Sequence, residues 1–282
     1  MTTCLFVSDL HGKDERFRRL FEEIGRARPA AVFIGGDIMP HHYLPDAPED
    51  FLERRFLGGL ARLRDDLGSS FPTVFTILGN DDGRWVEEPL LDAGERGLLV
   101  YAHGRAIPFG RWTVYGYSFV PPTPFRLKDW ERYDVSRHLE PGCVSPEEGV
   151  RSVPVSEDEA RYSTIREDLE TLAGSADMER AVFLFHAPPY DTVLDRAALD
   201  GMEVDHVPLD VHIGSIAVRR FIEERRPYLT LHGHVHESTR LTGEWRATVG
   251  RTTAFSAAHD GPELCVVRFD MEDPAGAARE LR

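Results

Sequence analysis

The sequence predicts an α/β fold whose N-terminal half contains a parallel sheet. Residues 3 to 8 form an apolar run that predicts a buried strand, and residues 30 to 34 predict a second strand. The apolar residues between them recur at helical spacing: Phe17, Leu20, Phe21 and Ile24. Strand, helix and strand in this order, with polar residues where the strands end, are typical of a parallel sheet covered by helices.

Further elements follow along the chain. Helices are expected near 49 to 67 and 157 to 173, and strands at 73 to 78, 181 to 185 and 228 to 232. Ser215 can cap a helix that runs to about Arg225.

Antiparallel strands and turns are expected in three places. Residues 98 to 118 are expected to form antiparallel strands with turns at Gly104 and Gly110, and 240 to 249 a hairpin around Thr242-Gly243. Residues 263 to 269 read as the final strand, with a frayed tail from Glu272.

Two long segments, 119 to 156 and 190 to 213, show no regular pattern. A loop of this length in a compact domain is usually a functional lid, an interface or disorder. In the first segment Trp130 and Tyr133 argue against disorder, so we expect it to cover a site or to form a subunit interface, which leaves a homo-oligomer open.

Length and composition predict a single domain over residues 1 to 282 that is neither secreted nor membrane-bound. The 41% hydrophobic content is ample for a core. A strand begins at once, without room for a signal sequence, and no run of 18 apolar residues occurs. Three distant cysteines predict no disulfide framework, so the expected location is the cytoplasm. The net charge of −15 disfavours long nucleic acid as a partner.

Polar side chains follow five of the predicted strands. They are Asp9 and His11, Asp37, Asn80, His186, and finally His234 and His236. Strand ends of one α/β sheet converge, so these groups are expected to share a crevice. Singly, each has an ordinary explanation as a helix cap or a loop residue. Together they form a mixed nitrogen and oxygen set large enough for two metal ions.

The pair His234 and His236 is the clearest of these signals. Two histidines spaced by one residue in extended backbone point to the same side, and Gly233 allows a sharp turn at the strand end. His232 is expected to lie in the core or behind the ligands. His206, His212 and His259 show no such spacing and are expected to be structural or loop-borne.

The order Asp-x-His, Gly-Asp, Gly-Asn-x-Asp, His and Gly-His-x-His resembles the calcineurin-like metallophosphoesterases, from Asp9 to His236. The resemblance implies a four-layer α/β/β/α sandwich, two mixed sheets flanked by helices, with a dinuclear metal site at the strand ends. It implies that Asp9, His11 and His236 hold one ion, that Asn80, His186 and His234 hold the other, and that Asp37 bridges them. The ions would be manganese, iron or zinc, and a metal-bridging hydroxide would attack the phosphorus.

The sequence departs from the family at one functional position. Many members have a histidine after Gly-Asn that donates a proton to the leaving group, whereas this chain has Asp81. Some members orient that histidine with an aspartate, and the matching residue here is Pro40. The paired absence is similar to the phosphodiesterases of the superfamily that carry Gly-Asn-Cys-Asp.

Other groups are candidates to replace the missing acid. They are Asp81 itself, if protonated, and His41 or His42 just beyond Asp37. Arg84 is a candidate to hold a phosphate oxygen, although a solvated arginine at a helix start is the simpler explanation.

The expected function is therefore metal-dependent hydrolysis of a small phosphoester, a diester in preference to a monoester. Asp37, Asn80, Asp81 and His42 are the candidate catalytic residues. The alternatives are a phosphomonoesterase or protein phosphatase, a nuclease, for which no basic groove is visible, and a catalytically weak protein-binding scaffold.

Overall fold

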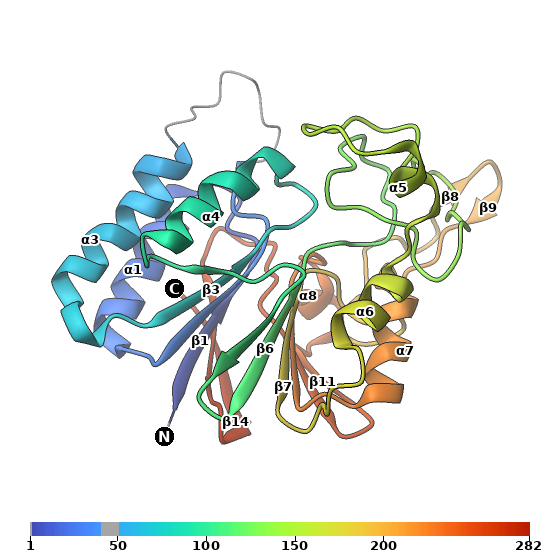
Figure 1. Ribbon diagram of the computed structural model, residues 1–282. Helices are drawn as coiled ribbons and strands as arrows, with labels where there is room; N and C mark the ends of the chain where they lie inside the picture. The colour runs from blue at the N-terminus through green and yellow to red at the C-terminus, as the bar shows by residue number, and fades with distance from the viewer. Residues whose placement is uncertain (1, 41–50) are drawn as a thin grey trace.

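The computed structural model describes residues 2–40 and 51–282, which form two six-stranded sheets with helices on their outer sides (Figure 1). The strand orders are β14-β13-β1-β2-β3-β4 and β11-β12-β10-β7-β6-β5. This arrangement confirms the predicted α/β sandwich of two mixed sheets.

The first sheet contains the N-terminal parallel strands. Its strands are β1 (Thr3–Val7), β2 (Ala31–Gly35), β3 (Thr73–Ile77), β4 (Val100–Tyr101), β13 (Cys265–Asp270) and β14 (Asp273–Leu281). Its helices are α1 (Asp14–Ala27), the π-helical η1 (Leu52–Leu57), α3 (Gly58–Leu67) and α4 (Glu87–Glu95), with short 3-10 turns η2 (Gly68–Ser70) and η3 (Arg84–Val86). Strands β1 to β4 run parallel, and β13 pairs with β1 antiparallel.

The second sheet contains most of the C-terminal half. Its strands are β5 (Ala106–Phe109), β6 (Trp112–Tyr117), β7 (Ala181–Phe185), β10 (Leu229–His232), β11 (Arg246–Val249) and β12 (Thr252–Ser256). Its helices are α5 (Glu157–Tyr162), α6 (Ile165–Ala173), α7 (Ile216–Arg225) and α8 (Ser238–Thr242), and β8 (Glu203–Val204) and β9 (Val207–Pro208) form a separate small hairpin. As predicted, Ser215 caps α7, because its Oγ accepts the Val218 N–H at 3.0 Å.

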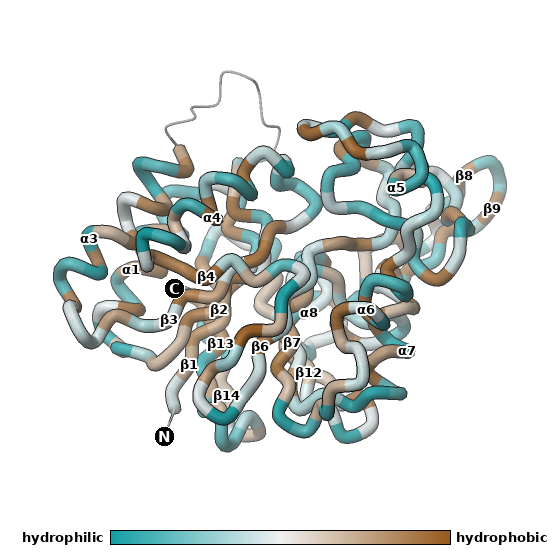
Figure 2. Tube along the Cα trace, in the orientation of Figure 1, coloured by the Kyte–Doolittle hydropathy of each residue, from teal (hydrophilic) through white to brown (hydrophobic). Residues whose placement is uncertain are grey.

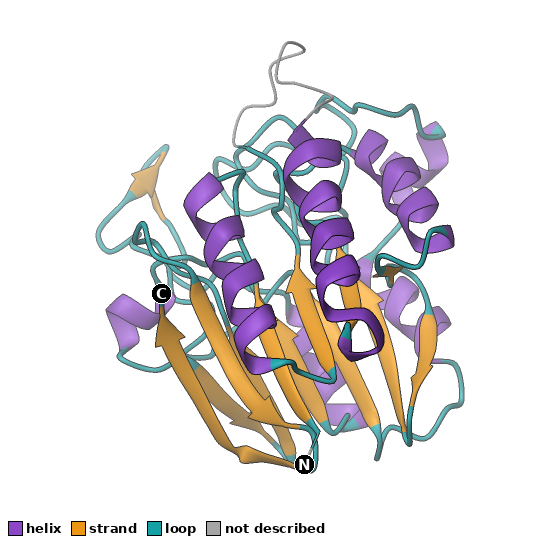
Figure 3. Cartoon of the chain, turned by 90° about the vertical axis from the view of Figure 1, so that its left-hand side faces the viewer, coloured by secondary structure: helices purple, strands orange, loops and turns teal. Residues whose placement is uncertain are grey.

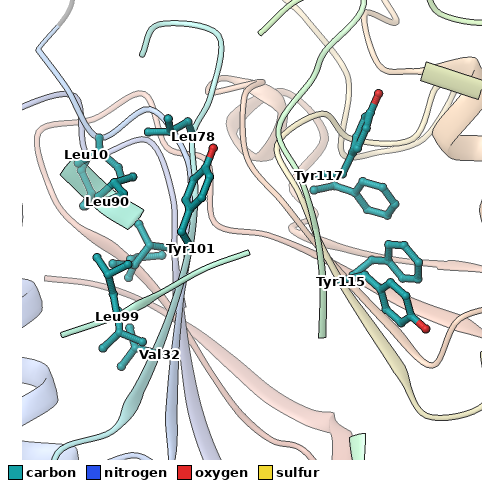
Figure 4. Packing of buried hydrophobic residues seen from close by; sticks show 14 of the residues in the cluster. Leu10, Val32, Leu78, Leu90, Leu99, Tyr101, Tyr115 and Tyr117 are labelled. Carbon is teal, nitrogen blue, oxygen red and sulfur yellow. The ribbon is translucent and has the colours of Figure 1, made fainter. Parts of the chain in front are cut away.

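The core follows from the alternation of side chains along the strands. On β1, Phe6 packs between the two sheets, whereas Leu5 and Val7 face the helices. Hydrophobic residues therefore concentrate along the strands (Figure 2), and helices cover the outer face of the first sheet (Figure 3). Figure 4 shows two groups of these core residues: Leu90 of α4 lies in one group with Leu10 and Tyr101, and Tyr115 and Tyr117 of β6 lie in the other.

One prediction failed at the crossing between the sheets. Residues 98 to 118 were expected to be consecutive antiparallel strands, but β4 pairs parallel with β3 in the first sheet. Only β5 and β6 form an antiparallel hairpin, around Gly110. Gly104 therefore lies where the chain passes from one sheet to the other, and it is not a hairpin turn.

Three other boundaries differ from the predictions. The helix expected at 157 to 173 is two helices, because Thr164 is extended and its side chain accepts the Glu167 N–H. The hairpin expected at 240 to 249 is wrong: α8 ends at Thr242 and is capped by Gly243, whose φ is 78°, and β11 pairs with β12. The tail from Glu272 is not frayed, since β14 pairs with β13.

Among the described residues, no helix combines the length and apolar character that a bilayer crossing requires.

Candidate metal centre

The strand-end side chains of both sheets meet at one place. The tightest group is Asp9, His11, Asp37 and His236, whose candidate ligand atoms all lie within 4.8 Å of one another. The Nε2 atoms of His11 and His236 are 3.0 Å apart, and His236 Nε2 is 3.5 Å from Asp9 Oδ1. Two carboxylates and two imidazoles that point at a common centre form a suitable donor set for a transition metal.

A second group shares Asp37 with the first. Asp37 Oδ2 lies 3.8 Å from His11 Nε2 and 3.2 Å from His186 Nε2. His186 Nε2 is in turn 3.1 Å from Asn80 Oδ1, and the rings of His186 and His234 have their centroids 5.2 Å apart. The structure therefore brings all seven expected ligands together, with one oxygen of Asp37 between the two groups.

The backbone reaches this arrangement through uncommon conformations. Four of the seven residues have positive φ: Asp9 at 57°, His11 at 48°, Asp37 at 50° and His234 at 73°. The left-handed region is sparsely occupied by residues other than glycine, although Asp and His are among those that tolerate it. This corrects the prediction that His234 and His236 approach the site in extended backbone, because the strand ends at His232 and the chain turns at His234.

Two glycines allow the ligand loops to approach closely. A Cβ on Gly79 would lie 2.3 Å from Asp37 Oδ1 and 2.6 Å from His186 Nε2. A Cβ on Gly233 would lie 2.1 Å from Ser8 Oγ. Gly233 is thus required for close packing against the first sheet, whereas the sharp turn falls on the residue after it.

The buried polar atoms fit a bound cation. Asp9 is fully buried, and its Oδ2 has no hydrogen-bond partner among the described residues. Its Oδ1 accepts the His234 N–H at 3.0 Å, which fixes the carboxylate toward the imidazoles. An unpaired buried carboxylate oxygen is costly, and a metal ion would satisfy it.

Charge keeps the carboxylates ionised despite their burial. Burial raises the pKa of Asp9 and Asp37, but the neighbouring imidazoles outweigh it, so both pKa values lie well below the usual range. Burial lowers the pKa of His186, but the Asp37 and Asp9 carboxylates and the Gly35 carbonyl oxygen together outweigh it and raise the pKa to about 10.

Asp82 holds the ligand loops together, a role that sequence reasoning missed. Its buried carboxylate accepts backbone N–H groups of Ile38, Met39 and Gly79 at 2.8 to 3.2 Å. These bonds join the loop of Asp37 to the loop of Asn80. Burial, followed by the nearby Asp37 charge, raises the pKa of Asp82 to about 7.

His232 lies behind the ligands, as expected for a core residue. It is buried, its Nδ1 lies 2.8 Å from the Ala187 carbonyl oxygen, and its ring stacks on Phe185. Burial lowers its pKa to about 4, so it stays neutral.

The other candidate residues have different positions. The Asp81 side chain lies beside the first group, with Oδ2 3.6 Å from His11 Nδ1. Arg84 faces a separate cavity with Arg132 and Asp168, and its Nη1 is 3.4 Å from Glu159 Oε1. The candidates His41 and His42 lie outside the described residues.

A cavity of about 460 Å³ opens above the metal centre. Asp37, Asn80, Asp81, His234 and His236 line its floor. Its walls come from both long loops, 119 to 156 and 190 to 213, so the first loop covers the site. Trp130 and Tyr133, two aromatic residues of the first loop, are buried.

His212, expected to be merely loop-borne, lines this cavity. Its Nδ1 lies 2.8 Å from Oδ1 of the buried Asp195. Asp195 also accepts the N–H groups of Asp191, Thr192 and Gly214, so the imidazole is held in a fixed orientation. No spacing in the sequence signals this pair, because the two residues are 17 apart within an irregular loop.

The comparison with known proteins agrees with this geometry. Residues 2–238 match the model of the calcineurin-like phosphoesterase family, and the chain belongs to that family. It is therefore a metallophosphoesterase. No curated protein matches the chain.

Solved structures show the same fold over nearly the whole chain. The protein TT1561 of Thermus thermophilus is 15% identical, with 99% of this chain and 98% of that chain covered and a TM-score of 0.59. A dimetal phosphatase from Danio rerio is 14% identical, with 94% and 91% covered and a TM-score of 0.52. At these identities the likeness shows the fold alone.

Proposed function

We propose that the seven strand-end residues hold two metal ions and that the protein hydrolyses a small phosphodiester in preference to a monoester. Asp9, His11 and His236 would hold one ion, Asn80, His186 and His234 would hold the other, and Asp37 would be shared by both. The observation that carries this proposal is the position of Asp37 Oδ2, 3.8 Å from His11 Nε2 and 3.2 Å from His186 Nε2. The whole chain, 1 to 282, acts as one domain in this proposal.

The metal pair, when bound, would acidify a water molecule, orient the phosphate and neutralise developing charge. The residues of the chain fix this arrangement. Asp37 Oδ1 accepts the Asp81 N–H at 2.9 Å, so the bridging carboxylate cannot rotate freely. Asp82 keeps the two ligand loops at a constant separation through its backbone contacts.

The preference for diesters rests on the leaving-group side of the site. No histidine follows Asn80, and Pro40 packs against Gly12 where relatives place an orienting aspartate. A general acid typically contributes about 10² to 10⁴-fold, so reactions with poor leaving groups suffer from its absence. The cavity above the metal centre leaves room for the second organic group of a diester.

The test is turnover after metal removal and reloading with manganese, iron or zinc separately. The substrates are bis(p-nitrophenyl) phosphate as diester and p-nitrophenyl phosphate as monoester. We expect Asp37→Asn and His236→Ala each to lower diester turnover more than about tenfold while far-UV circular dichroism stays unchanged, because they remove metal ligands. Asp65→Asn, an exposed change on α3, is the matched control.

Turnover within about threefold of wild type in either ligand variant, with two metals still bound, contradicts the dinuclear assignment. Faster monoester hydrolysis supports the phosphatase alternative. A protein that binds no metal and hydrolyses neither substrate supports the scaffold alternative.

A further inference from the structure

The described walls of the cavity above the metal centre lack the two side chains that always carry a positive charge. Among the described residues that line it, none is lysine or arginine. Residues 41 to 50, which the structure does not describe, contain neither residue type in the sequence. The walls also contain histidine, tyrosine and cysteine. All their other ionisable residues are acidic, namely Asp134, Glu140, Asp210 and Glu237.

Most of the remaining wall is apolar. Prolines and aliphatic side chains from both long loops contribute it: Pro121, Pro122, Pro124, Pro141, Val135, Leu199, Leu209 and Ile213. Phe125 also lines the cavity and is 61% exposed, which is unusual for a large apolar side chain. An aromatic ring left open at the edge of a cavity is suited to contact an apolar group of a ligand.

Two of these acidic side chains, Asp134 and Asp210, are held in place by neighbours and do not depend on a ligand. Asp210 accepts the Tyr190 hydroxyl at 2.6 Å and the His212 N–H at 2.8 Å. Asp134 accepts the Ile216 N–H at 2.7 Å at the start of α7. The wall is thus preformed for a neutral apolar group, and a second anionic group would meet carboxylates with no lysine or arginine among the described wall residues to pair with.

We propose that this cavity binds the organic part of a phosphoester that has a single phosphate and an apolar, uncharged organic group, with Phe125 as a contact residue. This inference rests on the proposed hydrolysis at the metal centre and adds the class of substrate. It excludes nucleotides with several phosphates and esters whose organic group carries a carboxylate.

The test compares two diesters that differ by one charge. Both p-nitrophenyl phenyl phosphate and p-nitrophenyl 4-carboxyphenyl phosphate lose p-nitrophenolate, so the leaving-group chemistry is the same. With the manganese-loaded full chain we expect kcat/KM to be at least about tenfold lower for the carboxyphenyl ester, mainly through KM. Phe125→Ala is expected to raise KM for the phenyl ester about threefold or more and to leave methyl p-nitrophenyl phosphate unchanged.

A charge variant tests the cause of the discrimination. Glu140→Lys places a cation at the cavity wall on an exposed residue, and we expect it to raise kcat/KM for the carboxyphenyl ester at least about threefold. Glu95→Lys makes the same change on α4, outside the cavity lining, and is the control.

Equal kcat/KM for the two diesters overturns the inference and leaves the proposed hydrolysis intact. If neither diester is hydrolysed, the proposed function fails. The inference about the cavity is then tested by measuring ligand binding. Calorimetric titration with diphenyl phosphate and with 4-carboxyphenyl phenyl phosphate then measures the same preference. Equal affinity for these two stable esters overturns it.

Discussion

Asp81 and Pro40 stand where the family resemblance leads us to expect a histidine and its orienting aspartate. Without a proton donor the leaving oxygen departs as an anion, so we expect the rate to fall steeply as the leaving group's pKa rises. A series of aryl and alkyl diesters measures this slope. A shallow slope in the wild type contradicts the prediction and indicates another proton donor. Among the described residues the candidate is His212, which Asp195 orients.

Introducing a histidine and an orienting aspartate at positions 81 and 40 is a second test of the same explanation. Asp81→His alone is expected to change little, because an unoriented imidazole occupies unproductive rotamers. With Pro40→Asp added, we expect turnover of a poor leaving group to rise about tenfold, or ~1.4 kcal/mol of barrier. An activated aryl ester serves as the control and is expected to change little. A double variant that accelerates neither ester refutes the missing-pair explanation.

His103 predicts a dependence of stability on pH. Its Nδ1 accepts the Ser118 N–H at 3.0 Å, and burial, followed by Arg132 and Arg84, lowers its pKa from 6.5 to about 3. The unfolded chain therefore binds more protons between these values, and the contribution to stability is lost as the pH falls below about 6.5.

The measurement is the free energy of unfolding of wild type and His103→Gln. Between about pH 7.5 and about pH 5, we expect wild type to lose up to about 2 kcal/mol more than the variant. All other titrating groups are shared, so the difference isolates His103. Parallel stability curves contradict the prediction.

For single residues, the sequence predicted which strand-end side chains lie close together, because each of them follows an apolar run directly. It could not predict the roles of Asp82 or of Asp195 with His212. Those roles depend on backbone N–H groups and loop contacts that residue type and spacing do not encode. The left-handed conformation of His234 was missed for the same reason.

Among the elements, the long loop 119 to 156 is fastened by a buried ion pair. Lys128 and Glu131 are fully buried and bonded to each other, and Glu131 also accepts the Thr123 N–H at 2.7 Å. We expect Glu131→Ala to loosen the loop, because removing one partner of a buried pair costs about 3–5 kcal/mol. Limited proteolysis is expected to cut the variant within this loop, and KM is expected to rise.

Glu148→Ala, an exposed change in the same loop, is the control. If the Glu131→Ala protein resists protease as well as the control does, the ion pair does not hold the loop. Cleavage that leaves KM unchanged shows that the loop is held by the pair but is not needed for substrate binding. Formation of a homo-oligomer through this loop stays a prediction.

Strands and helices with strong periodicity were predictable, and their interruptions were not. The apolar residues that predicted one helix, Ile165, Leu169 and Leu172, all lie in α6, whereas α5 buries no residue, and the cap at Thr164 separates the two helices. Strand β14 has few large apolar residues because it is an edge strand with much of its surface exposed, so its sequence resembles that of a frayed tail.

Across the whole molecule, the metal centre joins the two sheets. Asp9, Asp37 and Asn80 follow strands of the first sheet, whereas His186 and His236 follow strands of the second. Metal bound to both sheets stabilises the folded state by mass action. At 100 times the Kd this linkage contributes about 2.7 kcal/mol, so we expect Tm to rise by about 5 to 10 °C.

Differential scanning calorimetry of metal-free and manganese-loaded protein measures this shift. Asp37→Asn is the comparison, and we expect a smaller shift because the shared ligand is weakened. An identical Tm with and without bound metal contradicts a site that bridges the sheets.

The parallel first sheet followed from the sequence pattern, whereas the paired-sheet architecture followed from family resemblance. The reason is the crossing after β4, where two adjacent short strands enter different sheets. Which sheet a strand joins depends on partners far along the chain, and local periodicity does not contain that information.

The left-handed backbone of Asp9, His11, Asp37 and His234 affects how this chain can evolve. Asparagine adopts that conformation at low cost, and its side-chain oxygen can still accept the N–H groups that Asp9 and Asp37 accept, so we expect asparagine at these two positions to leave the local backbone intact. The left-handed backbone therefore costs little free energy in a sequence that has lost these metal ligands. A related protein that has lost its metal ligands in this way would keep the same fold and the same surface. Selection for a function of that surface alone would be enough to preserve the fold.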